Sequence, residues 1–388
     1  MIKVLKFGGS SLISKDTRIH ALQHIVDELK INQKVVVVVS AMGRLGDNYA
    51  TDTLKGLVKG ASKADTDLLM SCGEIISCCV LSSELKELGI NSKALNTFQT
   101  GIKVTSEFSD ANVIDVDVST IMKLLQDYDV LVVPGFQGIT KDDEIATLGR
   151  GGSDFSAIIL GDYLESVSVD IFSDVKGVMT ANPKEIDEAK LIKKLHYSDL
   201  ISLAYQGASV VHHKAVEYAY LKQVNLRFRS TFKNGIGTIV FNNSKSDSFY
   251  SLCSSSDKAI IEIFSKKDRY VIKNFYQELS NHDFKISLLH LSMHSIQILI
   301  DKINLQDFIE IVKENNFLYK VTSEIGRISI VTNSKKDKRE ISLKVLKILI
   351  ESEISVHHID ISKNTISLIV DEKALKKSMN ILHTYFSE

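Results

Sequence analysis

The stretch KVVVVVS, residues Lys34–Ser40, decides the fold because its five successive valines leave the strand no polar face. A continuous β-branched run of this length is typical of a central strand that is covered on both faces. The stretch IKVLKF, residues Ile2–Phe7, predicts a second buried strand, and residues Ala21–Lys30 between the two have helical periodicity. Strands that alternate with helices in this way indicate an α/β layered sheet.

The same alternation continues outward from these two strands to about residue 241. One or two helices are predicted over Asp65–Leu88, another helix over Ser153–Leu164, and strands over Asp129–Val133 and Ser166–Phe172. We therefore predict a sandwich whose central, mostly parallel sheet carries helices on both faces. Such sheets bind ligands at the carboxyl ends of their strands, which is where three loops fall: Gly8–Ser11, Ala41–Gly46 and Ser173–Gly177.

The pattern changes after residue 241, where the polar stretch Asn242–Ser248 reads as a linker. Shorter segments follow in the order βαββαβ, given twice, as in ferredoxin-like units. Strands are predicted at Ala259–Phe264, Ser295–Ile300, Arg327–Val331, Ser355–Asp360 and Thr365–Val370, and helices at Tyr270–Asn281, Asn304–Asn315, Leu343–Ser352 and Glu372–Phe386. The predicted domains are residues 1–241, a linker with a first strand at 242–256, and two small domains at 257–322 and 323–388.

Composition excludes several classes of function. The chain has 388 residues, 44% of them hydrophobic and 24% charged, with a net charge of −1. That balance provides no field to attract nucleic acid or an anionic membrane. No signal peptide is visible and no apolar run approaches the roughly 20 residues of a membrane span, so we expect a cytoplasmic protein. The four cysteines lack the spacing of metal ligands and are expected to be buried small hydrophobic side chains.

Two glycine-rich motifs carry the chemistry. KFGGSS, residues Lys6–Ser11, ends the first strand, where adjacent glycines let backbone amides approach a phosphate and the lysine can neutralise its charge. The motif differs from a Walker A loop, whose lysine follows the glycines. GRGGSD, residues Gly149–Asp154, opens a predicted helix, whose N-terminus favours an anion. In this motif Arg150 can pair with a carboxylate through two hydrogen bonds.

Two further segments have polar residues at informative places. In IFSD, residues Ile171–Asp174, Ser173 and Asp174 follow a strand and suit contacts to an adenine nucleotide, although a plain turn explains them as well. In SCGE, Glu74 lies within an otherwise apolar helix. A buried carboxylate needs a partner or a function, and a satisfied core ion pair is the alternative.

Together these motifs resemble the aspartokinase branch of the amino acid kinase family. The resemblance rests on KFGGSS, VVVVVSAMGRLGDNYATD, SCGE, PGFQG, LGRGGSD and IFSDVKGVMTANP, and it continues through AYQGASVVHHKAV and LRFRSTF to about residue 241. The paired C-terminal units are similar to that family's tandem ACT domains. SAMGRLGDNYATD is most similar to the form in Bacillus-type bacteria, with the diaminopimelate-sensitive enzyme as the nearest pattern.

This resemblance implies ATP-dependent phosphorylation of the side-chain carboxylate of L-aspartate, the first step toward lysine, threonine, methionine and diaminopimelate. It implies that Lys6 stabilises the transferring phosphoryl group and that Asp154 organises Lys6 and the phosphates. Arg150 would hold the substrate α-carboxylate and Glu74 its amine. The aspartate pocket would be lined by Ser40, Ala41, Phe136 and Ser153.

The same resemblance assigns the nucleotide site. ATP would be contacted by Lys6, Gly8, Gly9, Ser10, Ser173, Asp174, Met179, Lys184 and Ser209. Mg²⁺ would bridge the β- and γ-phosphates, as phosphoryl transfer generally requires, without a dedicated protein site. No general base is needed, because the accepting carboxylate is already ionised near pH 7.

The chain departs from the family pattern at several positions. Ser209 stands where a phosphate-contacting lysine is expected, and His213 where proline is expected, although Lys214 is close in sequence. Asn182 and Lys184 stand in place of Asp and Arg, and lysine lacks the bidentate geometry of arginine. A catalytically weakened homologue with a regulatory role is therefore an alternative, as is a kinase for acetylglutamate, glutamate or UMP.

The C-terminal units depart further. Leu288 and Leu289 occupy an effector strand that usually carries an aspartate, and KKDKRE, residues Lys335–Glu340, replaces a glycine-containing loop. The sequence therefore leaves open whether lysine, threonine, diaminopimelate or no amino acid acts as effector. The resemblance implies a homodimer formed through these units, whose exposed sheet edges can pair. The pairs His212–His213 and His357–His358 are expected to be structural.

Overall fold

The computed structural model describes residues 1–207, 211–242, 249–264, 286, 288–291, 295–334 and 337–387. The chain divides into two compact units. Unit 1 comprises Met1–Thr180 and Lys190–Asp247, and unit 2 comprises Ala181–Ala189 and Ser248–Glu388. Residues Ala181–Ala189 thus leave unit 1 and pack with unit 2, where Ala181 and Ile186 join a hydrophobic cluster.

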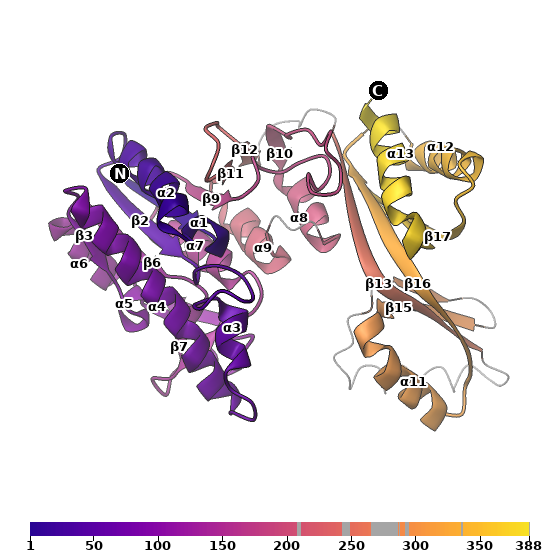
Figure 1. Cartoon of the computed structure of the whole chain (residues 1–388), viewed down its shortest axis with the longest axis horizontal. Coiled ribbons are helices and arrows are strands. Elements are labelled where there is room, and N and C mark those ends of the chain that lie inside the picture. The colour runs from indigo at the N-terminus through magenta and orange to yellow at the C-terminus, as the bar shows by residue number, and fades with distance from the viewer. Residues whose placement is uncertain are drawn as a thin grey trace. The chain divides into compact units, whose positions relative to one another are not determined.

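Unit 1 is built on an eight-stranded sheet (Figure 1). In spatial order its strands are β10 (Lys194–His196), β12 (Thr238–Phe241), β11 (Leu226–Ser230), β9 (Val169–Ser173), β1 (Ile2–Phe7), β2 (Lys34–Val39), β6 (Val130–Pro134) and β3 (Ser92–Ala94). All neighbouring strands are parallel except β11 and β12. A four-stranded sheet lies in the same unit, in the order β5 (Val113–Val116), β4 (Ile102–Val104), β7 (Gln137–Ile139) and β8 (Ile145–Thr147). The predicted α/β sandwich with a mostly parallel sheet is confirmed.

The helices of unit 1 are α1 (Gly9–Leu12), α2 (Lys15–Leu29), α3 (Thr51–Gly56), α4 (Lys63–Glu87), α5 (Thr97–Thr100), α6 (Ser119–Asp127), α7 (Gly152–Tyr163), α8 (Tyr197–Tyr205) and α9 (His213–Lys222). Ser14 caps the N-terminus of α2: its side chain accepts a hydrogen bond from the Thr17 amide, and the Thr17 side chain accepts one from the Ser14 amide. This reciprocal cap satisfies two amides that a helix start leaves free. The region predicted as one or two helices is the single helix α4, and part of the predicted loop Gly8–Ser11 is the one-turn helix α1.

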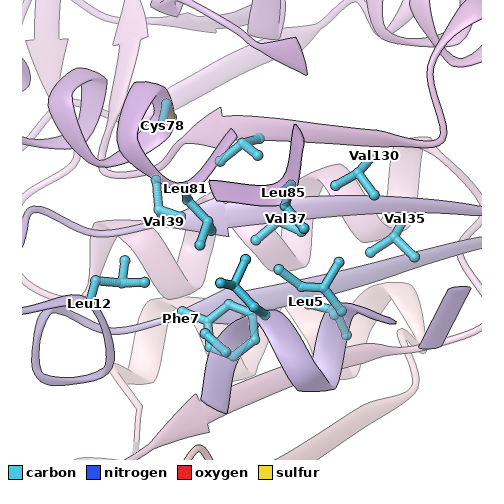
Figure 2. Close-up of a cluster of buried hydrophobic side chains, with 14 of the residues drawn as sticks. Leu5, Phe7, Leu12, Val35, Val37, Val39, Cys78, Leu81, Leu85 and Val130 are labelled. Atoms are coloured by element: carbon cyan, nitrogen blue, oxygen red, sulfur yellow. The ribbon is translucent and has the colours of Figure 1, made fainter. Parts of the chain in front are cut away.

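The valine run explains the core. Val35, Val37 and Val39 face a cluster that also contains Leu5 and Phe7 of β1, and this cluster is covered by α2 and α4 (Figure 2). Helix α7 packs on β1, β2 and β9, where its apolar side chains Ile158 and Ile159 are fully buried. Every valine of the run is therefore inside, as expected for a strand that is covered on both faces.

Helix α4 requires a correction to the expectation that no segment approaches the length of a membrane span. By length and composition it could cross a membrane, but half of its most apolar window is buried inside the structure. Cys78, Leu81 and Leu85 of α4 lie in the core cluster. This is the behaviour of a core helix. Of the cysteines, Cys78 and Cys253 are buried as expected, whereas Cys72 and Cys79 are exposed.

Unit 2 contains one six-stranded antiparallel sheet, in the order β14 (Leu288–Leu291), β15 (Ser295–Asp301), β13 (Tyr250–Phe264), β16 (Leu318–Thr332), β18 (Thr365–Asp371) and β17 (Val356–Ile361). Its helices are η1 (Lys302–Asn304), α11 (Leu305–Glu314), α12 (Lys338–Glu351), η2 (Glu372–Ala374) and α13 (Leu375–Ser387). The helix predicted over Tyr270–Asn281 and most of the predicted linker lie outside the described residues. In KKDKRE, Lys338 already begins α12, so the end of that stretch is helical.

Strands β13 and β16 are longer than predicted, and each serves both halves of the sheet. The first part of β13, Tyr250–Ser255, pairs with the end of β16, and the second part, Lys258–Phe264, pairs with β15 as well as with the start of β16. Each half of the sheet therefore has four strands, as in a ferredoxin-like unit. The boundaries predicted at residues 257 and 323 fall within these shared strands, so the division into two domains stays a prediction.

Candidate active site

The candidate site lies at the carboxyl ends of the central strands of unit 1. Lys6 is the next-to-last residue of β1, Ser40 follows β2, and Phe136 follows β6. These strands are neighbours in the sheet, so their ends converge on one edge. Parallel α/β sheets bind ligands at this edge.

Lys6 and Asp154 form the central ion pair of the site. Their charged atoms, Nζ and Oδ1, lie 2.6 Å apart, and both side chains are largely buried. Asp154 lies in the first turn of α7, so the helix itself fixes where the carboxylate stands. The pair fixes the Lys6 ammonium at the carboxyl end of β1, where an anionic ligand can reach it.

Gly9 shows why the sequence needs a glycine beside this lysine. A Cβ at Gly9 would lie 2.5 Å from the Gly43 carbonyl oxygen and 2.6 Å from that of Ala41. Those distances are too short for a side chain, so any other residue would push the loop after β2 away from β1. The backbone at Gly8 and Gly9 remains uncovered by side chains of its own, which suits the approach of a phosphate.

Glu74 is a buried carboxylate with one oxygen unused. It is 1% exposed, and its Oε1 accepts a hydrogen bond from the Ala41 amide at 2.9 Å. Within the described part of the chain its Oε2 has no hydrogen-bond partner. Burial raises the pKa of Glu74 to about 8, against the opposing effects of the Ala41 amide and the Lys6 charge. Among the described residues no cation forms an ion pair with Glu74, which argues against the alternative of a satisfied core ion pair.

Arg150 projects from a turn between β8 and α7. Gly149 and Gly151 on either side have φ angles of 69° and 74°, a region that favours glycine. A Cβ at Gly151 would also lie 2.5 Å from Cβ of His212. In the described residues the Arg150 guanidinium pairs with no carboxylate, and its side chain is exposed. It can therefore receive the carboxylate of a ligand.

These side chains surround one cavity of about 640 Å³. Its predicted members are Lys6, Ser40, Glu74, Phe136, Arg150, Ser153 and Asp154. The glycines of the predicted GRGGSD motif, Gly149, Gly151 and Gly152, also line it. Other lining residues escaped prediction: Thr51, Asp52, Lys55, Met70, Ser109 and Thr147. Phe136 has a φ of 74°, a strained conformation for an aromatic residue that is typical of functional sites.

The remaining predicted residues lie elsewhere. Gly8 follows β1, Ser10 lies in α1, and the Ala41 backbone amide donates a hydrogen bond to Glu74. None of these three residues is among those that line the cavity. Ser173 ends β9, Asp174 forms an ion pair with Arg44 at 3.1 Å, and Met179 pairs with Leu191 in an isolated bridge. Lys184 belongs to unit 2, and Ser209 lies outside the described residues.

The substitute for Ser209 that sequence suggested is engaged elsewhere. Lys214 lies in α9 and forms an ion pair with Asp110, with Nζ and Oδ1 3.0 Å apart.

The missed residues of α3, Thr51 and Asp52, end the motif SAMGRLGDNYATD, so only their place in that motif could have pointed to them. Among the described residues, no group of three or more His, Cys, Asp or Glu side chains is arranged to hold a metal ion.

Comparisons with protein families, curated sequences and solved structures all match this chain to amino acid kinases or aspartokinases. A model of the Amino acid kinase family matches residues 1–230. Aspartokinase 1 of Bacillus subtilis is 34% identical over 99% of this chain and 98% of the relative, and the aspartokinase of Geobacillus stearothermophilus is 29% identical over 99% and 97%. The solved structure of E. coli aspartokinase III in complex with aspartate and ADP covers 100% of both chains, with a TM-score of 0.82 at 19% identity. That of Clostridium acetobutylicum aspartate kinase has a TM-score of 0.76 at 18% identity and covers 99% of both chains.

Proposed function

Because the chain belongs to the amino acid kinase family, and within it to the aspartokinases, we propose that it phosphorylates the side-chain carboxylate of L-aspartate. ATP is the phosphoryl donor and 4-phospho-L-aspartate the product. The observation that supports this function best is that one cavity is lined by a buried carboxylate, Glu74, a guanidinium, Arg150, and a buried lysine, Lys6. An amino acid that carries a second carboxylate is the ligand that needs all three.

The ammonium and the α-carboxylate, both attached to Cα of the amino acid, would be held by opposite charges. Glu74 would bind the substrate ammonium, since its Oε2 is buried and has no hydrogen-bond partner among the described residues. Arg150 would bind the α-carboxylate through two parallel hydrogen bonds. With both groups on Cα held, the side-chain carboxylate would be free to extend toward Lys6. Ser40, Ser153 and Phe136, together with the Ala41 backbone, would shape the remaining wall.

Phosphoryl transfer then depends on position and charge. An oxygen of the aspartate carboxylate forms a bond with the γ-phosphorus while the bond to the ADP oxygen breaks, so no proton needs to move. Lys6 would neutralise charge on the transferring group, and Asp154 would hold Lys6 in place.

The nucleotide phosphates would approach the backbone at Gly8, Gly9 and Ser10, where Gly9 leaves no room for a side chain. Mg²⁺ bound to those phosphates would supply further charge neutralisation. Ser173, Asp174 and Met179 would contact the rest of the nucleotide.

Unit 2 would have a regulatory role. Its two groups of four strands correspond to the tandem ACT domains expected from the family, and we propose that they bind an amino-acid effector and join two copies of the chain. We also propose a cytoplasmic location. Which amino acid acts as effector is a separate question from the catalytic assignment.

The decisive experiment is an ATP- and Mg²⁺-dependent hydroxamate assay with L-aspartate, run beside glutamate, acetylglutamate and UMP as competing acceptors in a coupled ADP assay. Turnover with aspartate alone supports the proposal. Turnover only with another acceptor contradicts it. A Ser209→Lys variant run in parallel identifies a weakened kinase, because only a missing cation would let that variant exceed the parent strongly.

A further inference from the structure

A second carboxylate on α4 is buried more completely than Glu74. Asp67 lies seven residues before Glu74, on the same face of the helix and about 10 Å away along its axis. It is 0% exposed, yet it does not line the cavity. A buried carboxylate of this kind is stable only when donors replace the water that it loses.

The donors to Asp67 come from two segments that line the cavity. Its Oδ2 accepts hydrogen bonds from the backbone amides of Ser109 at 2.8 Å and Thr147 at 2.7 Å. Its Oδ1 accepts a third from the Ser109 hydroxyl at 3.2 Å. Hydrogen bonds to an ionised carboxylate are roughly twice as strong as neutral ones. Asp67 therefore ties α4 to β8 and to the loop before β5.

Both tied segments lead directly to the proposed receptor of the α-carboxylate. Thr147 is the last residue of β8 and stands three residues before Arg150. The Thr147 carbonyl accepts from the Ala111 amide at 2.9 Å, which joins the two segments to each other. A Cβ at Gly149 would lie 3.1 Å from the Ser109 carbonyl oxygen, so the turn that carries Arg150 rests against this loop.

Thr147 also presents an unused polar atom. Its Oγ1 is buried and, within the described part of the chain, has no hydrogen-bond partner. Thr147 lines the same cavity as Glu74, whose Oε2 is in the same condition. A substrate ammonium has three donors, and these two oxygens are acceptors on residues that line one cavity.

From this geometry we infer that Asp67 is a positioning residue for the amino-acid pocket. It holds Ser109, Thr147 and the turn of Arg150 at the distances that the amino acid needs, without touching the amino acid itself. The inference rests on the proposed function, since it assumes that the cavity binds L-aspartate. It assigns to Asp67 an effect on the amino acid and none on the nucleotide.

The test is steady-state kinetics of Asp67→Ala and Asp67→Asn in the full chain. Alanine removes both acceptor oxygens and with them all three hydrogen bonds, and we expect the KM for aspartate to rise roughly tenfold to hundredfold, the range that displacement of a positioning group produces. The KM for ATP should stay unchanged. Asparagine keeps one oxygen for both amides but is a weaker acceptor, so it should raise the KM for aspartate only severalfold.

The matched control is Glu84→Ala. Glu84 is another carboxylate of α4, paired with Arg18 at 2.7 Å, and it lines no part of the cavity. This variant should lose thermal stability and keep both KM values. A merely structural Asp67 would behave in the same way, with less folded enzyme, lower apparent kcat and unchanged KM.

The outcomes separate the inference from the proposed function. If the parent protein does not phosphorylate aspartate, the proposed function fails. If the parent is active and the KM for aspartate is unchanged in a folded Asp67→Ala variant, the inference alone is overturned. If that variant does not fold, Asp67→Asn decides in its place, and an unchanged KM for aspartate there overturns the inference equally.

Discussion

Two lysines on one strand show how differently buried charge can be used. Lys3 and Lys6 both lie on β1, and both are buried, at 1% and 8% exposure. Lys3 is near the amino end of the strand and Lys6 near its carboxyl end. The groups around Lys3 are almost completely paired with one another, whereas those around Lys6 leave polar atoms unused.

At the amino end, Asp170 of β9 gathers three cations. Lys3 lies 2.5 Å from it, Arg227 2.6 Å and Arg229 2.9 Å. Burial opposes the ionisation of Asp170, but hydrogen bonds from Arg227 and the charge of Lys3 outweigh it and hold the pKa of Asp170 below its usual value. Glu28 of α2 pairs with the same two arginines. Of these side chains only Arg229 Nε is both buried and without a hydrogen-bond partner in the described residues.

At the carboxyl end, two buried acceptor oxygens have no hydrogen-bond donor among the described residues. Glu74 Oε2 and Thr147 Oγ1 have no partner among the described residues, and both belong to residues that line the cavity. A buried polar group without a partner costs about 1–3 kcal/mol. The difference teaches that the paired cluster belongs to the fold and the unpaired one to a ligand.

The largest expected effect is the loss of activity in Lys6→Ala. The variant removes the cation beside the transferring phosphoryl group, and groups of this kind contribute roughly 10³–10⁵ in rate. The measurement is kcat in the hydroxamate assay. Thermal unfolding of the variant, measured in parallel, separates the loss of catalysis from any loss of stability caused by breaking the buried ion pair with Asp154. A folded variant with normal turnover would contradict the role of Lys6 in phosphoryl transfer.

Next in size is the loss of stability in Asp170→Ala. Three cations would lose their shared carboxylate, and breaking a buried charge cluster destabilises a protein by about 3–5 kcal/mol. Urea unfolding would measure the change. The KM values for aspartate and ATP should match those of the parent at a temperature where the variant is folded. A selective rise in either KM would show that the amino-end cluster also serves the site.

The sequence predicted the sheet and the motifs of the site for a physical reason. The valine run of β2 admits no arrangement other than a covered strand, and glycine-rich motifs identify places where backbone must approach a ligand. Lys6, Glu74, Arg150 and Asp154 were each identifiable from such local context, and the structure brings all four to one cavity.

Asp67, Ser109 and Thr147 were not identifiable in this way. They come from a helix, a loop and a strand, and only the tertiary structure makes them neighbours. No local pattern marks an aspartate whose partners are backbone amides forty or eighty residues away.

Strand β13 was misjudged for a related reason. The polar residues Ser254–Lys258 interrupt its apolar pattern, so the sequence predicted a first strand that ends before residue 257 and a separate strand over Ala259–Phe264. In the structure the strand continues through them, with a register shift between Ser255 and Lys258 and a φ of 56° at Asp257. A bulge lets one strand serve two halves of a sheet, and its polar residues pattern like a loop.

The third prediction concerns Arg150→Ala. Loss of the α-carboxylate receptor should raise the KM for aspartate roughly a hundredfold, since hydrogen bonds between charged groups contribute about 1.5–3 kcal/mol each. The KM for ATP should be unaffected. Lys103→Ala, which removes an exposed ion pair with Asp115, is the control and should leave both constants as they are. Unchanged aspartate kinetics in Arg150→Ala would contradict the pocket assignment.

The smallest and most specific effect is the pH dependence that Glu74 imposes. Burial raises the pKa of Glu74 to about 8 from a usual 4.5, so the Glu74 carboxyl group is protonated at neutral pH when no substrate is bound. An arriving ammonium favours the carboxylate form, so binding releases this proton. The KM for aspartate should therefore fall roughly twentyfold between pH 6.5 and 8.5. Kinetics of Glu74→Gln test this, because a neutral amide should give a higher KM without that slope.

The same shift fixes the sign of a stability effect. In the folded chain Glu74 keeps its proton up to a pH of about 8, and in the unfolded chain only up to about 4.5. Its contribution to stability is therefore complete below pH 4.5 and is lost as the pH rises through 8. The unfolding free energy of the parent should therefore fall more steeply between pH 5 and 8 than that of Glu74→Gln, which has no group to ionise at this position. Asp170, whose pKa is lowered, has the opposite sign, because its contribution is lost as the pH falls. If Glu74→Gln kept the parent's slope between pH 5 and 8, Glu74 would be ionised in the empty pocket, and the contrast with the paired cluster would lose its electrostatic basis.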